Sequence, residues 1–165
     1  MTPETLPDRP LSRDELADLT EELAAEPERW AHLVQHDPQR RTYVQLWRDA
    51  HVDVWLICWL DDHDTGYHDH DVSSGAVKVV SGELVEERLR LGGPPRSCRY
   101  TPGERFTFDA SHVHRMHHAG GGPAISIHAY SPPLWRMGAY VVEEDGTLRR
   151  ESVSYAEELR PLQPV

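Results

Sequence analysis

The chain has 165 residues, which is enough for one domain with a single core and too few for two comfortable domains. Its 28 acidic residues outnumber the 17 Lys and Arg, and the net charge of -11 opposes nucleic acid and anionic membrane surfaces as partners. The N-terminus has neither a basic start nor an apolar run, so we expect a cytoplasmic protein. Cys58 and Cys98 form no CxxC pair, and neither a disulfide framework nor a thiolate zinc site is indicated. The oligomeric state is left open.

The first 40 residues are charged and helix-forming. Ser12 and Glu15 form a capping box, and leucines at 16, 19 and 23 recur at helical spacing, so SRDELADLTEELAAE is predicted to be an amphipathic helix. Pro27 begins a second predicted helix, PERWAHLVQHD, with a narrow apolar stripe. We therefore expect residues 1–40 to be a helical segment that packs on a larger body.

The pattern changes near Tyr43 to short β-rich runs separated by turn signals. The runs are DVWLICWL, AVKVV, ELVEERLRL, RFTFD, AISIHAY and AYVVEE, and the turns contain SG, GGPP, PGE, GGGP, SPP and DG. Six or more strands at this spacing predict a mainly β fold, a barrel or jelly roll, over residues 41–165.

The strongest chemical signal lies in two histidine clusters among the 11 histidines of the chain. His68 and His70 in YHDH lie two residues apart, so on an extended strand both side chains point to the same face, which in a barrel can be the interior. The second cluster, SHVHRMHH at 111–118, follows after a hairpin that can bring it beside the first. A solvated polar strand would explain one isolated pair, but two clusters together favour a metal site.

These residues resemble the cupins, whose first motif has the form G-x5-HxH-x3,4-E-x6-G. His68, His70 and Gly82 match that motif, and His114 matches the histidine of the second motif. Gly75, however, stands where the glutamate ligand would be. A divalent iron held by three neutral imidazoles keeps its full charge, favours an anionic ligand such as a thiolate, and leaves a position for dioxygen.

The segments ICWLDDHDTGYHDHD and SIHAYSPP are similar to cysteine dioxygenase and its relatives among the small thiol dioxygenases, with the likeness covering roughly residues 43–140. The resemblance implies a cupin-type barrel with N-terminal helices, and Fe(II) bound by His68, His70 and His114. It also implies a cis Ser131-Pro132 bond. The implied reaction adds both atoms of O2 to the sulfur of a small thiol and gives a sulfinate.

The same resemblance implies an outer relay in which Ser126 orients His128 and His128 orients the phenol of Tyr130 toward the reacting groups. Positions 126, 128 and 130 share one face of a strand, as such a chain of hydrogen bonds requires. Gly75 occupies the position where animal cysteine dioxygenases carry the cysteine that crosslinks to tyrosine, so this chain cannot form that thioether.

The substrate is less well defined. Cysteine-specific members carry a Tyr-x-Arg element whose arginine pairs with the substrate carboxylate. The corresponding stretch here is YVQ, so Tyr43 and Gln45 are candidate substrate contacts, as is Tyr67 beside the first ligand. Gln45 looks like the relatives that accept 3-mercaptopropionate, unless a nearby arginine substitutes for it: Arg40, Arg41 or Arg48. Cysteine or a close analogue is favoured narrowly.

Other functions stay open. A thiol-imidazole betaine such as ergothioneine could place its quaternary ammonium on a tryptophan: Trp47, Trp55 or Trp135. A metal-dependent cupin enzyme that acts on a non-thiol substrate could use the same histidines without the relay of Ser126, His128 and Tyr130. A cupin that only binds a ligand could dispense with the metal.

Overall fold

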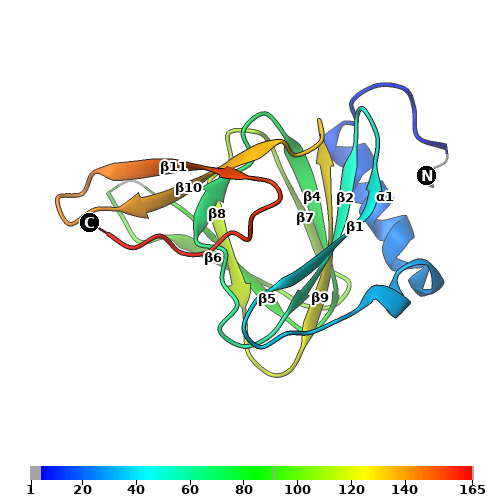
Figure 1. Cartoon of the computed structure of the whole chain (residues 1–165), viewed down its shortest axis with the longest axis horizontal. Helices are drawn as coiled ribbons and strands as arrows, with labels where there is room; N and C mark the ends of the chain where they lie inside the picture. Colours follow the sequence, from blue (N-terminus) through cyan, green and yellow to red (C-terminus); the bar gives the residue numbers. More distant parts are fainter. Residues whose placement is uncertain (1–4, 91, 165) are drawn as a thin grey trace.

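The computed structural model describes residues 5–90 and 92–164 and consists of two antiparallel β-sheets that face each other (Figure 1). The five-stranded sheet has the order β1 (Thr42–Arg48), β2 (Asp53–Trp59), β9 (Ala124–Ser131), β4 (Ser74–Ser81) and β7 (Arg105–Phe108). The six-stranded sheet has the order β11 (Leu148–Ser154), β10 (Arg136–Val142), β3 (Tyr67–Asp69), β8 (His114–His118), β5 (Leu84–Arg88) and β6 (Arg96–Tyr100). The predicted mainly β, jelly-roll architecture is confirmed.

The helix α1 (Arg13–Ala24) covers the outer face of the five-stranded sheet (Figure 1). The predicted capping box is present: Ser12 Oγ accepts from the Glu15 amide, and the Glu15 carboxylate accepts from the Ser12 amide. The apolar stripe of the helix packs on strand residues that point outward, forming one buried cluster that includes Leu16, Leu19, Leu23, Val54, Leu56, Ile127 and Ala129. This layer leaves the alternate residues of the same strands free to face the other sheet.

The second predicted helix is wrong. Residues 27–33 form two single 3-10 turns, η2 (Pro27–Arg29) and η3 (Ala31–Leu33), separated by Trp30. Trp30 has a φ of -138°, outside the helical range, while its buried indole donates to the Leu23 carbonyl at the end of α1. Burial of this indole and its hydrogen bond to α1 therefore override the local helical pattern.

The second core cluster lies between the sheets and includes Trp59, Val77, Phe106, Phe108, Met116 and Met137. Every predicted strand run is present. The runs did not include β1, β6 and β11, which lie at sheet edges and have no fully buried position, or β8, which was expected only as a histidine cluster. Both cysteines are free. In the described part of the chain no helix has the length and apolar character that crossing a membrane demands.

Candidate metal centre and active site

Three histidines from the six-stranded sheet converge between the sheets. His68 on β3 lies directly opposite His114 on β8, and His70 follows two residues after His68. One ligand atom from each of the three lies within 4.8 Å of the others, and the side chains are only 4%, 2% and 1% exposed for residues 68, 70 and 114. The strand register thus brings together the two clusters that the sequence separates by more than forty positions.

The ring nitrogens of this group are suited to a divalent metal. The Nδ1 of His68 contacts the Gly66 carbonyl at 3.0 Å, whereas His114 Nε2 and His70 Nδ1 are buried without a hydrogen-bond partner among the described residues. Burial lowers the pKa of all three imidazoles, so they are neutral. Neutral imidazoles with unsatisfied nitrogens are the donors that first-row metals bind, and the group contains no carboxylate.

Sequence reasoning missed Glu86 on β5, a fully buried carboxylate behind His114. Its Oε1 accepts from His114 Nδ1 at 3.0 Å and from His112 Nε2 at 2.8 Å. Burial alone would raise the pKa of Glu86, but these hydrogen bonds hold it well below its ordinary value. The ligand atoms of Glu86, His112 and His114 also lie within 4.8 Å of one another, but they already bond to each other. Glu86 therefore orients His114 and turns its Nε2 toward the other two histidines.

The predicted trio on β9 forms a continuous chain of hydrogen bonds. Ser126 Oγ lies 2.8 Å from His128 Nε2, and His128 Nδ1 lies 3.1 Å from the Tyr130 hydroxyl. The indole of Trp59, which the sequence did not single out, donates to Ser126 Oγ at 2.9 Å. Burial lowers the pKa of His128 to about 3 and raises that of Tyr130. The imidazole is therefore neutral and the phenol protonated.

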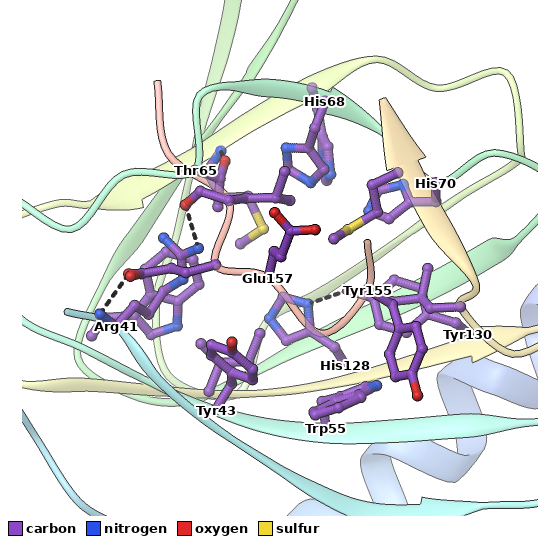
Figure 2. Close-up of a pocket in the computed structure, with 18 residues that line it drawn as sticks. Arg41, Tyr43, Trp55, Thr65, His68, His70, His128, Tyr130, Tyr155 and Glu157 are labelled. Atoms are coloured by element: carbon purple, nitrogen blue, oxygen red, sulfur yellow. Dashed lines mark hydrogen bonds between the residues drawn. The ribbon is translucent and has the colours of Figure 1, made fainter. Parts of the chain in front are cut away.

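The histidines and Tyr130 line one cavity between the sheets (Figure 2). Arg41 lines the same cavity and is 5% exposed. Its guanidinium donates to the Leu159 carbonyl at 2.8 Å and lies 4.9 Å from the Trp59 ring centroid. Within residues 5–90 and 92–164, no carboxylate makes a direct ion pair with this guanidinium. The cavity therefore contains a buried guanidinium, whose charge is offset without direct contact by the carboxylates of Glu158 and Asp64.

Two of the expected substrate contacts lie elsewhere. Gln45 donates its amide to Asp53 Oδ1 at 2.9 Å and does not line the cavity, because it satisfies a carboxylate that is fully buried. Tyr67 donates to Glu87 at 3.1 Å and is likewise outside the lining. Tyr43 does line the cavity. Of the three arginines considered as substitutes for Gln45, only Arg41 lines the cavity. Arg40 pairs instead with Asp37, and Arg48 pairs with Asp53.

Gly75 has a structural reason to lack a side chain. A Cβ at this position would lie 2.3 Å from Phe108 Cζ, and the Phe108 ring stacks on His70 with 4.4 Å between centroids. Phe108 thus fills the space beside His70 and needs the glycine opposite it. The Ser131-Pro132 bond is cis, as predicted.

Comparison with solved structures identifies the class of fold. A cupin superfamily protein from Desulfitobacterium hafniense aligns with a TM-score of 0.52 at 14% identity, covering 62% of this chain and 87% of its own. A protein with a double-stranded β-helix domain from Klebsiella pneumoniae aligns with a TM-score of 0.53 at 16% identity, covering 76% of this chain and 85% of its own. The barrel is therefore of the cupin type.

Sequence comparison identifies the family. The family model described as cysteine dioxygenase type I matches residues 8–143. Cysteine dioxygenase type 1 of Danio rerio is 26% identical over 132 residues, and that of Homo sapiens is 25% identical over 131 residues. Each match covers 73% of this chain and 66% of the relative, so the chain spans about two thirds of the length of these proteins. The chain belongs to the cysteine dioxygenase type I family.

Proposed function

We propose that the protein is an Fe(II)-dependent thiol dioxygenase that adds both atoms of O2 to the sulfur of a small thiol bearing a carboxylate, cysteine or a close analogue. The observation that carries this proposal is a cavity that combines three neutral histidines, a buried arginine and the hydroxyl of Tyr130. Family membership supports the same chemistry. The reaction is balanced: a thiolate and one O2 give one sulfinate, with sulfur losing the four electrons that dioxygen gains.

The metal would be held by His68, His70 and His114, with Glu86 fixing the ring of His114. When bound, ferrous iron supplies open coordination positions and the one-electron chemistry that dioxygen activation needs. The protein contributes the geometry: the three rings are buried, and the hydrogen bond to Glu86 fixes the ring of His114. The three histidines and Tyr130 are almost fully buried, which limits their contact with bulk water.

Arg41 is the group that would bind the substrate carboxylate. Its guanidinium lines the cavity and donates to the Leu159 carbonyl, and a guanidinium has five N–H donors, so donors are left for a ligand. Glu158 and Asp64 offset the buried charge of Arg41 without a direct ion pair, so an incoming carboxylate that bonds to the guanidinium would further lower the cost of burying it. This assignment favours a carboxylate-bearing thiol over cysteamine, which has none.

Tyr130 would assist the attack on sulfur by donating a hydrogen bond. If the Ser126 hydroxyl donates to His128 Nε2, then Nδ1 carries the ring proton and donates to the phenol oxygen. The hydroxyl hydrogen of Tyr130 is then free to point into the cavity, where oxygen atoms gain negative charge.

The test is oxygen consumption by the iron-loaded protein with cysteine, 3-mercaptopropionate, cysteamine and ergothioneine, with the products identified by mass. We expect a sulfinate from cysteine and a much lower kcat/KM for cysteamine. An equal kcat/KM for cysteine and cysteamine would show that Arg41 does not bind the substrate carboxylate. No oxygen consumption with any of the four thiols would overturn the thiol dioxygenase proposal and favour a cupin that acts on another substrate.

A further inference from the structure

A buried carboxylate separates the two histidines of the first cluster. Asp69 lies between His68 and His70 in the sequence, and successive side chains of a strand alternate between its faces. The Asp69 side chain therefore leaves β3 on the face opposite to the imidazole of His68. The residue is nevertheless only 8% exposed. A buried acid thus stands directly behind the proposed metal site.

Hydrogen-bond donors surround this carboxylate. Arg150 on β11 bonds to both oxygens, with Nε 2.8 Å from Oδ2 and Nη2 3.0 Å from Oδ1. The Tyr140 hydroxyl donates to Oδ2 at 2.6 Å, and the amides of Gly138 and Asp71 donate to Oδ1 at 3.0 and 2.9 Å. A bidentate arginine fixes the orientation of a carboxylate as well as its distance. Asp69 is therefore held by β10, by β11 and by the turn that follows it.

The sheet leaves a path for this arginine. β10 lies between β11 and β3, and Gly138 on β10 pairs with Asp69. A Cβ on Gly138 would lie 2.2 Å from Arg150 Nε and 2.4 Å from Arg150 Cζ. The glycine thus leaves the space in which the guanidinium crosses β10 and reaches the strand that carries His68.

The strand that Arg150 reaches is short and has few pairings of its own. β3 has three residues, and it pairs with β8 at a single position, His68 with His114. His70 lies beyond the end of β3 and is followed by a turn at Asp71, whose φ is 55° and whose amide bonds to Asp69. The placement of both imidazoles therefore depends on how firmly Asp69 is held.

We propose that Arg150 is a positioning residue that acts through Asp69 to hold the imidazoles of His68 and His70 in the arrangement that the proposed metal site requires. Arg150 does not line the cavity, and β11 lies beyond residue 143, where the match to the family model ends. The role rests on the proposed function for its use in metal binding. The arrangement of the imidazoles, however, can be measured without metal.

The first experiment uses the metal-free protein with labelled histidine, whose ring signals are followed by NMR. Arg150→Ala should shift and broaden the ring signals of His68 and His70, because Asp69 loses its bidentate partner. Gly138→Ala should have the same effect, since the new Cβ displaces the guanidinium.

Arg149→Ala is the matched control. Arg149 lies on the same strand and forms ion pairs with Glu143 and Glu151, so its loss removes an equally charged side chain without touching Asp69. Both imidazole signals should stay unchanged in this variant. Thermal melts show whether each variant folds.

Chemical rescue separates a positioning role from a general loss of stability. The Arg150 side chain is 37% exposed, so a small cation can enter the space that Arg150→Ala opens. Millimolar methylguanidinium chloride should restore the wild-type signals in Arg150→Ala but not in Gly138→Ala, where the Cβ occupies that space. Sodium chloride at the same concentration should restore neither.

Metal affinity is the second measurement, with Co(II) as a spectroscopic probe. Arg150→Ala should weaken Co(II) binding by about tenfold, the lower end of the range for groups that support metal ligands. Methylguanidinium should recover most of this loss. Arg150→Lys keeps the charge without the bidentate geometry, so it should fold and show an intermediate loss.

Unchanged imidazole signals in both Arg150→Ala and Arg150→Lys would overturn the proposal. A loss that methylguanidinium does not restore would overturn it as well, because the effect would then be one of general stability. If the imidazole signals respond and recover as expected but the wild-type protein binds no metal, the proposed metal site fails, whereas the coupling of Arg150 to the two imidazoles stands.

Discussion

The two ends of the cavity are built in different ways. The histidine end comes from paired strands in the barrel interior, where His68 and His114 face each other across β3 and β8 and every ring is almost fully buried. The mouth comes from the start of β1 and the C-terminal segment, and its charged groups include the exposed Glu157. The first end therefore has the rigidity that metal ligands need, and the second can vary its charge without disturbing the barrel.

Removing a ligand at the histidine end should have the largest effect. We expect His114→Ala to weaken ferrous iron binding by about a hundredfold or more, because losing a ligand must cost at least as much as losing its supporting contact. His117→Ala, on the same strand but outside the cavity lining, should retain iron. Metal analysis measures the iron content of the two variants, and thermal melts show whether both fold. Full iron occupancy in His114→Ala would exclude that histidine as a ligand.

The support behind the ligand should matter nearly as much. Glu86→Gln should weaken iron binding by about tenfold, because a neutral amide oxygen is a weaker acceptor than the carboxylate oxygen that now accepts from both imidazole N–H groups. Glu87→Gln is the matched control, since the neighbouring side chain bonds to Tyr67 on the other face of β5. Competition with a chelator measures both affinities. Equal affinities would show that the geometry of His114 does not depend on Glu86.

The relay lies between the two ends, and its loss should affect turnover without releasing metal. Tyr130→Phe should keep iron and lose about tenfold in kcat/KM, the equivalent of one oriented hydrogen bond. Tyr67→Phe should leave kcat/KM unchanged, because that hydroxyl bonds to Glu87 outside the cavity. Steady-state oxygen consumption measures kcat/KM for both variants. A loss in Tyr67→Phe instead would return that residue to the substrate site.

The sequence predicts much of the histidine end of the cavity, for a physical reason. On a strand, residues two apart share a face, so spacing alone places His68 with His70 and aligns Ser126, His128 and Tyr130. Alternation also explains why Glu86 was missed. Two adjacent glutamates must face opposite sides of a strand, and nothing local says which one faces inward.

The mouth could not be predicted because no local pattern connects its parts. Arg41 and Glu157 are more than a hundred residues apart, and the segment around Glu157 has no periodicity that indicates a buried neighbour. Gln45 was a plausible carboxylate contact by motif, but a buried Asp53 takes its amide. The helix expected after Pro27 failed for a related reason, since a tertiary contact of Trp30 outweighs a helical pattern.

The most direct test of the dioxygenase assignment is turnover of cysteine by the iron-loaded protein under 18O-labelled dioxygen, followed by mass analysis of the product. The dioxygenase reaction predicts a sulfinate in which both oxygen atoms carry the label, with one O2 consumed for each sulfinate formed. A product that contains oxygen from water, or only the disulfide of cysteine, would contradict it.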